Sequence, residues 1–191
     1  MPEMAGIGHN RGPQVEGASW RGHCWRQARA ALLPVLPVEV VRLRVRRAQA
    51  LGLDYKTYAG VRATTGRDLV AFLFSSNGLG VFRDGTALPA GRAERLARLD
   101  ARRDLGAGRG LDARALAERI GATSAIRLPD FGEGWGAMRD RMKGWLRAEG
   151  LPGDAVLMIG ETDHERELCA AGGLAGFLTG MRYFEGQSDG I

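Results

Sequence analysis

The feature that most constrains the fold is an apolar run at residues 155–159, which has the length and composition of a strand covered on both faces. Thr162, with Glu165 three positions later, matches a capping box and therefore starts a helix after this strand. A second apolar run follows at 174–178. A strand, a helix and a second strand in this order predict a βαβ unit with parallel strands. The ligand-facing edge of such a unit lies at the carboxyl end of its first strand, at Gly160.

The rest of the chain extends this unit into an α/β protein. Residues 123–128 form another candidate strand, and helices are expected at 89–103, 111–120 and 135–150. A glycine-rich linker is expected at 105–110. We predict the α/β class, with an N-terminal helical segment and a small Rossmann-like βαβ unit of parallel strands. The predicted organisation is a disordered tail at 1–18, a helical segment at 19–80, a small α/β domain at 81–185 and a tail at 186–191.

The apolar run at 69–74 decides how far the sheet extends, and its sequence fits two structures. Its hydrophobic residues follow no clear period, so a helix and a buried strand both fit. Thr65 and Asp68 provide helix start signals, which favour the helix. The alternative is an extended run that pairs with 155–159 as a further strand of the sheet.

The charge of the chain favours an acidic partner such as nucleic acid. The formal net charge is +5 and the isoelectric point is about 9.9. Only Lys56 and Lys143 are lysines, so 25 of the 27 basic residues are Arg. Together with 29 Gly, this composition is typical of GC-rich coding sequences, which reduces the weight of the charge as evidence for nucleic-acid binding.

Cysteine usage and hydropathy indicate a cytoplasmic protein. Cys24 and Cys169 are too few for a disulfide framework, which favours a reducing compartment. The apolar run at 30–41 is interrupted by two prolines and is too short to span a bilayer. The first residues lack the apolar core of a signal peptide, so no membrane partner is expected.

Residues 48–62 have the pattern of two helices joined by a turn. Gly52 lies at the turn between Leu51 and Leu53, and Asp54 is placed to cap the second helix. This stretch resembles the bacterial helix-turn-helix signature. The resemblance implies DNA contacts by four side chains, which are Tyr55, Lys56, Thr57 and Arg62. The same pattern also fits a plain helical corner in an all-α subdomain.

Acidic residues follow the first strand of the βαβ unit. Glu161 and Thr162 come directly after the strand, and Glu165 follows three residues later. This arrangement resembles the fourth motif of haloacid-dehalogenase-like (HAD-like) hydrolases, an apolar strand followed by Gly-Asp-Ser/Thr and a second Asp. The resemblance implies that Glu161 and Glu165 hold Mg²⁺, a hard cation that prefers oxygen ligands, and that Lys143 binds phosphate. The same residues also fit a capping box and a dipole-stabilised first turn, without any metal.

The nucleophile motif of that family is an apolar strand followed by Asp-x-Asp-Gly-Thr. The comparable stretch here is 71–74, followed by Ser75-Ser76-Asn77-Gly78. Ser75 stands at the nucleophile position and Asn77 at the general acid–base position. Neither side chain can carry out the family's aspartyl-phosphate chemistry, so ordinary phosphatase activity is not expected.

Two functions of different classes follow from these observations. The first is a non-catalytic regulatory protein that binds nucleic acid or a protein partner through its Arg-rich helical half. The alternative is a degenerate HAD-like, Mg²⁺-dependent phosphohydrolase with its site near 160–165. A scaffold or assembly subunit is a third hypothesis, supported by the four Trp residues.

Overall fold

The computed structural model of the protein describes residues 36–186. The predicted tail at 1–18, the first part of the predicted helical segment and residues 187–191 lie outside the described residues. The chain divides into two compact units between Val41 and Arg42. The second unit contains every strand described below.

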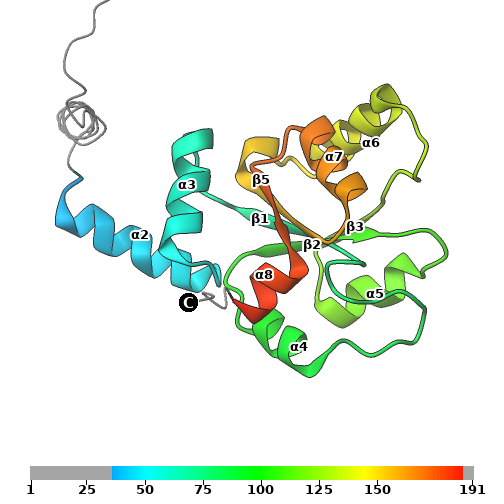
Figure 1. Ribbon diagram of the computed structural model, residues 1–191, viewed down its shortest axis with the longest axis horizontal. Helices are drawn as coiled ribbons and strands as arrows, with labels where there is room; N and C mark the ends of the chain where they lie inside the picture. The colour runs from blue at the N-terminus through cyan, green and yellow to red at the C-terminus, as the bar shows by residue number, and fades with distance from the viewer. Residues whose placement is uncertain (1–35, 187–191) are drawn as a thin grey trace, which may run out of the picture. The chain divides into compact units, whose positions relative to one another are not determined.

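Helices and strands alternate along most of the described chain (Figure 1). The elements are α2 (Val38–Ala50), α3 (Tyr55–Thr65), β1 (Ala71–Ser75), α4 (Ala90–Ala97), β2 (Arg102–Ala107), α5 (Ala113–Ile120), β3 (Ser124–Arg127), α6 (Trp135–Ala148), the 3₁₀ turn η1 (Gly153–Ala155), β4 (Val156–Gly160), α7 (Asp163–Gly172), β5 (Gly176–Thr179) and α8 (Gly180–Glu185). No helix within this part of the chain is long and apolar enough to cross a membrane.

The five strands form one parallel sheet in the order β3-β2-β1-β4-β5. The central strand β1 pairs with β2 on one side and with β4 on the other, so that Ala71 lies opposite both Arg102 and Val156. From β1 the chain adds β2 and β3 on one side of this central strand, and it then returns to add β4 and β5 on the other side. The order therefore reverses between β1 and β4, and this pair is the topological switch point of the sheet.

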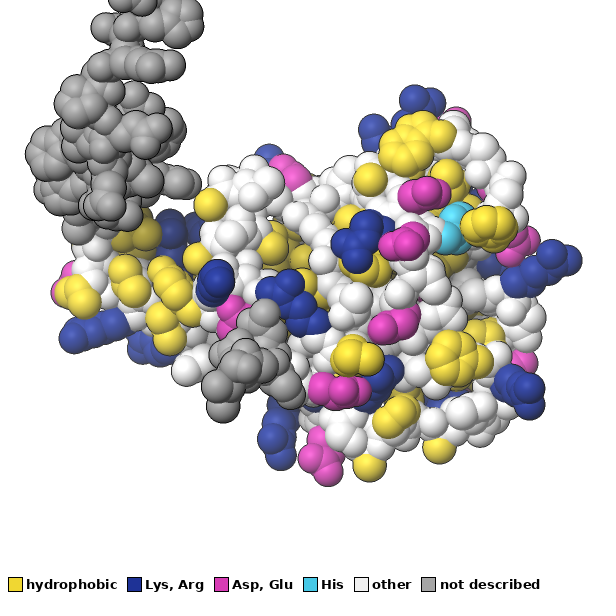
Figure 2. Space-filling view, in the orientation of Figure 1, with side chains coloured by type: hydrophobic (Ala, Val, Ile, Leu, Met, Phe, Trp, Pro, Cys, Tyr) yellow, Lys and Arg dark blue, Asp and Glu magenta, His cyan; other side chains and the backbone are white. Residues whose placement is uncertain are grey.

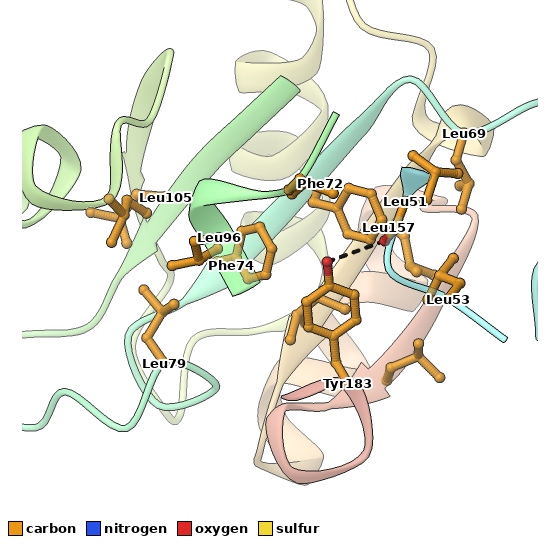
Figure 3. Close-up of a cluster of buried hydrophobic side chains, with 14 of the residues drawn as sticks. Leu51, Leu53, Leu69, Phe72, Phe74, Leu79, Leu96, Leu105, Leu157 and Tyr183 are labelled. Atoms are coloured by element: carbon orange, nitrogen blue, oxygen red, sulfur yellow. Dashed lines mark hydrogen bonds between the residues drawn. The ribbon is translucent and has the colours of Figure 1, made fainter. Parts of the chain in front are cut away.

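Helices cover both faces of the sheet, and each face has its own core. Phe72 and Phe74 of β1 pack with the α2–α3 turn and with α4, α5 and α8 (Figure 3). Ala71 and Leu73 point to the opposite face and pack with α6 and α7. Tyr183 of α8 lies against both phenylalanines, and its hydroxyl donates to the carbonyl of Leu51 (Figure 3). This three-layer arrangement confirms the predicted α/β class with a Rossmann-like unit of parallel strands.

The run that follows α3 is a strand, which corrects the helix favoured from the sequence. Every residue of β1 is buried, because helices cover both sides of this central strand. A strand of this kind has no polar face and therefore no readable period. Thr65 also does not start a helix, since it is the last residue of α3 and Gly66 caps that helix with φ 73°. The predicted helical segment at 19–80 thus contains the first strand of the sheet, and the α/β domain begins before residue 81.

The strand β2 corrects a second expectation, which is a helix over 89–103 followed by a linker over 105–110. Its charged side chains hide the strand pattern. Asp104 is fully buried and accepts hydrogen bonds from Arg102 Nε and from the backbone and hydroxyl of Ser124. Burial of a carboxylate is tolerated because it is paired and hydrogen-bonded. The helix α8 is a further element that the sequence pattern does not predict.

The βαβ prediction near the C-terminal end is confirmed. The strands expected at 123–128, 155–159 and 174–178 correspond to β3, β4 and β5. α7 begins with the predicted capping box of Thr162 and Glu165. These elements were readable because each is marked by signals a few residues apart in the sequence.

Candidate functional site

The carboxyl ends of β1 and β4 bring together the residues that the HAD-like resemblance singled out. Ser75 ends β1, and Asn77 and Gly78 follow it in the next turn. Gly160 ends β4, and Glu161 follows it. Because ligands of open α/β sheets bind outside the carboxyl ends of strands at a switch point, this edge is the candidate site.

The carboxylate of Glu165 is the centre of the site. Its Oε1 accepts a hydrogen bond from Asn77 Nδ2 at 3.1 Å, which ties the loop after β1 to α7. Its Oε2 accepts from the backbone N–H groups of Glu161 and Thr162 at 2.7 and 2.9 Å. The side chain is only 2% exposed. Both oxygens are therefore used inside the protein, in a buried position where each bond replaces lost hydration.

Glu161, in the same loop, connects to the neighbouring strand β5. This residue is exposed, but its Oε2 accepts a hydrogen bond from the backbone N–H of Gly180 at 3.0 Å. Gly180 is the first residue of α8 and follows β5 directly. Glu161 thus connects the end of β4 to the end of β5.

Three glycines allow the backbone segments at this edge to touch. A Cβ on Gly180 would lie 2.2 Å from the carbonyl oxygen of Gly78. A Cβ on Gly78 would lie 2.5 Å from the carbonyl oxygen of Ile159, and a Cβ on Gly160 would lie 2.9 Å from Glu165 Oε2. Backbone and side chains of the protein therefore fill the space between β1, β4 and β5, where a ligand of the fold would enter.

The serines after β1 hold the loop in place. Ser75 is fully buried, and its Oγ accepts from the backbone N–H of Gly78 at 2.9 Å. Ser76 Oγ accepts from the backbone N–H of Gly108 at 3.1 Å, which connects the loop to the end of β2. A nucleophilic serine needs an adjacent base, and within residues 36–186 the Ser75 hydroxyl makes no hydrogen bond to one. The geometry of Ser75 is that of a turn residue.

The residues at this edge do not fit Mg²⁺. Mg²⁺ requires several oxygen ligands with free lone pairs, arranged in near-octahedral geometry. Glu165 accepts N–H donors at both oxygens, and Glu161 accepts one at Oε2. Within residues 36–186, no group of three or more His, Cys, Asp and Glu side chains is placed to hold a metal ion.

Lys143 is not brought to this site. It is exposed on α6 and lines a surface cleft with Gly153, Asp154 and Gly173. Gly153 precedes β4 and Gly173 precedes β5, so the cleft lies at the amino-terminal edge of these strands. The phosphate-binding role implied for Lys143 has no support from its position, because α6 carries the residue away from the carboxyl ends.

The α2–α3 corner has the local geometry expected from the sequence. Gly52 has φ 64° at the turn, and Asp54 caps α3 by accepting from the backbone N–H of Thr57 at 2.7 Å. Tyr58 is buried and donates its hydroxyl proton to Asp68 at 2.7 Å. Arg62 forms an ion pair with the same carboxylate at 3.6 Å. The Arg62 side chain is 32% exposed, and its charge is thus paired with Asp68 rather than free.

The other predicted DNA-contacting residues differ in whether their side chains are free to contact DNA. Thr57 donates its hydroxyl proton to Asp54 and accepts from Arg182 Nη2 at 3.1 Å. Tyr55 is half-buried. Lys56 is exposed, and none of the ion pairs formed within the described part of the chain involves it. Of the four residues, Lys56 is the one whose charge faces solvent.

Exposed arginines of α2 add to this charge. Arg42 and Arg46 are exposed, one turn apart, and neither has an ion-pair partner among residues 36–186. Like charges at this spacing destabilise a helix slightly. Leu43, between them, is 58% exposed. Figure 2 shows Lys and Arg side chains next to hydrophobic ones over α2 and α3.

Cys169 of α7 is excluded as a nucleophile. The thiol is 6% exposed, and its burial raises its pKa to about 11. Reactive cysteines have a lowered pKa and an exposed sulfur. Cys169 packs in the core with Met142 and Leu168.

The sequence predicts Glu165 as a capping residue and, under the strand alternative for 69–74, predicts that Asn77 and Glu165 converge on one site; it does not predict the hydrogen bond between them or the role of Gly180. The capping box is a local signal, whereas Asn77 lies 88 positions away. The Asn-Gly pair after an apolar run is a signal for a turn at this edge, but it does not identify the partner.

Comparison with protein-family models and with curated proteins provides no relative from which a function could be assigned. No protein-family model matches the chain, and no curated protein matches it.

Proposed function

We propose that the protein is a non-catalytic regulatory protein that binds nucleic acid through the exposed basic residues of α2 and α3. The observation that carries the non-catalytic part is the use of both Glu165 oxygens in hydrogen bonds within the protein. A catalytic carboxylate needs a free oxygen that reaches the reacting group. The buried Ser75 hydroxyl and the contact between Gly78 and Gly180 support the same conclusion.

The uncompensated charge of α2 and α3 supports a polyanionic partner. We define the basic surface as Arg42, Arg46 and Lys56, which are all exposed. Arg47 and Arg62 do not belong to it, because both pair with Asp68. Phosphate contacts by such side chains release counterions, which makes the affinity fall with salt.

Replacing the basic surface is expected to weaken DNA binding. The triple variant R42A/R46A/K56A removes three charges, so the slope of log affinity against log salt should become shallower by about 3. The measurement is fluorescence anisotropy of a short labelled DNA duplex, titrated with protein at several salt concentrations. The matched control is R109A/R114A/R139A, which removes the same charge from side chains that are 85%, 90% and 50% exposed elsewhere. An equal loss in both variants would contradict a specific basic surface.

A degenerate HAD-like phosphohydrolase is the second candidate. The observation that favours it is the position of Asn77, Glu161 and Glu165 at the switch point, where the fold places ligands. The test is a broad panel of phosphate esters assayed with Mg²⁺, using the full chain and the E161A variant. We expect no turnover by either protein. Turnover that is lost in E161A and kept in E167A, an exposed neighbour on α7, would instead support the phosphohydrolase.

A further inference from the structure

Asparagine followed by glycine occurs once in the chain, at Asn77-Gly78 in the turn after β1. The chain has only one other asparagine, Asn10, and an arginine follows it. Asparagine is chemically labile, because the backbone nitrogen of the next residue can attack its side-chain amide. This attack is least hindered when the next residue is glycine, which has no Cβ in the way. Asn77 is therefore the residue of this chain at which spontaneous deamidation is expected first.

The reaction consumes only water. The Gly78 nitrogen loses its proton to hydroxide and forms a bond to Asn77 Cγ. The bond from Cγ to Nδ2 breaks, and Nδ2 takes a proton from water and leaves as ammonia. Water then opens the resulting cyclic imide at one of its two carbonyls. Opening at Cγ gives aspartate, whereas opening at the main-chain carbonyl gives isoaspartate, in which the backbone runs through the former side chain.

Both reacting groups are held in the folded protein. The Gly78 N–H is the nucleophile, and it donates to Ser75 Oγ at 2.9 Å, where both residues are buried. The Asn77 amide is the group attacked, and its Nδ2 donates to Glu165 Oε1 at 3.1 Å. The nitrogen must leave Ser75 before hydroxide can take its proton, and the amide must leave Glu165 before it can turn toward that nitrogen. Reaction therefore requires the turn to open.

The backbone of the turn is also fixed by its neighbours. The N–H of Gly80 donates to the Asn77 carbonyl at 2.9 Å, and Arg92 Nη1 of α4 donates to the Gly78 carbonyl at 3.0 Å. Gly78 lies so close to the end of β4 that a Cβ on it would be 2.5 Å from the Ile159 carbonyl oxygen. Because α4 and β4 both hold the turn, it opens only when this edge of the sheet loosens locally.

Either product of the reaction disrupts this edge. Aspartate at position 77 has an oxygen where the Asn77 amide now donates, 3.1 Å from the buried Glu165 carboxylate, and two carboxylates this close repel each other. Isoaspartate lengthens the backbone by a methylene group just before Gly78. The contacts of Gly78 with the backbone of Ile159 and with Gly180 leave no space for that displacement.

We propose that Asn77 is a deamidation site that the folded protein keeps closed through Ser75 and Glu165, and that reaction there prevents an opened chain from rebuilding the sheet edge. Opening of the turn is reversible until the imide forms and irreversible afterwards. The modified fraction therefore accumulates with the time that the edge spends open. This proposal does not rest on nucleic-acid binding, because the turn and the basic surface share no residue.

The experiment measures the deamidation rate of the full chain in mildly alkaline buffer, with and without guanidinium chloride. Trypsin releases residues 68–83 as one peptide, which contains Asn77, and mass spectrometry gives its deamidated fraction over time. The rate should be about tenfold or more higher in guanidinium chloride, because unfolding frees both reacting groups. Equal rates in the two solutions would overturn the proposal.

The variant S75A tests the bond that holds the nucleophile. In buffer it should deamidate several-fold faster than the parent, and in guanidinium chloride the two rates should be equal. The matched control is S76A, which removes the same group from the next buried residue, whose Oγ accepts from Gly108 and not from Gly78. The proposal fails if S75A reacts as slowly as the parent in buffer, or if S76A reacts as fast as S75A.

The consequence of the reaction is tested without S75A. N77D represents the aspartate product, and N77A removes the same hydrogen bond to Glu165 without adding a charge. N77D should unfold at a lower guanidinium concentration than N77A, since repulsion is added to the lost bond. If the two midpoints agree, deamidation does not prevent the edge from closing and the proposal is overturned.

Discussion

Replacing Gly180 with Ala is expected to destabilise the protein more than any other single methyl addition at the sheet edge. The new Cβ would lie 2.2 Å from the carbonyl oxygen of Gly78, and the next nearest atoms also belong to the backbone of Gly78. Backbone cannot turn aside as a flexible side chain can, so β5 and the loop after β1 must separate. The free energy of unfolding should fall by about 3 kcal/mol or more. Urea unfolding followed by circular dichroism measures this loss.

The matched control for this prediction is Gly144→Ala in α6. Gly144 lies in a helix, and a Cβ there would meet no atom within 4 Å. Since Ala is the better helix former, the control should raise the free energy of unfolding by about 0.5–1 kcal/mol. If both variants change stability by the same small amount, the close contact between Gly180 and Gly78 does not hold.

Replacing Glu165 with Ala is expected to have the second largest effect. It leaves three donors without their acceptor, namely the Asn77 amide and the backbone N–H groups of Glu161 and Thr162. Glu165 itself is buried, and each hydrogen bond to a charged carboxylate contributes about 1.5–3 kcal/mol. The free energy of unfolding should fall by about 3 kcal/mol. The exposed Glu167 on the same helix is the control, and E167A should change stability by less than about 0.5 kcal/mol.

A double-mutant cycle separates the contact with Asn77 from the capping role of Glu165. The variants are N77A, E165A and the combination of both, measured by urea unfolding. Because the two side chains are in direct contact at 3.1 Å, their effects should not add, and the coupling energy should be about 1 kcal/mol or more. Effects that add within about 0.3 kcal/mol would mean that Glu165 acts only as a helix cap.

Glu165 has a wider role in the acidic loop than a helix cap alone. The sequence offered two interpretations, a metal ligand and a capping residue. The capping box is present, and the bond to Asn77 adds a function that neither interpretation included. At the switch point, the Glu165 carboxylate thus connects the loop after β1 to the loop after β4. The proposed binding function is accordingly assigned to another surface of the molecule.

Several elements could be predicted from local signals in the sequence. The apolar run of β4, the capping box of α7 and the run of β5 are separated by only a few residues, so their order alone predicted the βαβ unit. The α2–α3 corner was predicted in the same way, from Gly52 and the Asp54 cap. Such signals depend on contacts between residues that are close in the sequence. They therefore form in the same way whichever distant segments pack around them.

The remaining features could not be predicted in this way, because they depend on which distant segments become neighbours in the folded protein. The run at 71–75 is a strand since helices cover both of its faces, and its sequence has no period that distinguishes it from a helix. Asn77 meets Glu165, 88 positions later in the chain, because β1 and β4 are paired neighbours in the sheet. The guanidinium of Arg95 reaches Gly52 and Tyr183 only when α4, α8 and the α2–α3 turn pack together. Contacts of this kind are fixed by the topology of the sheet, which the local pattern of residues does not encode.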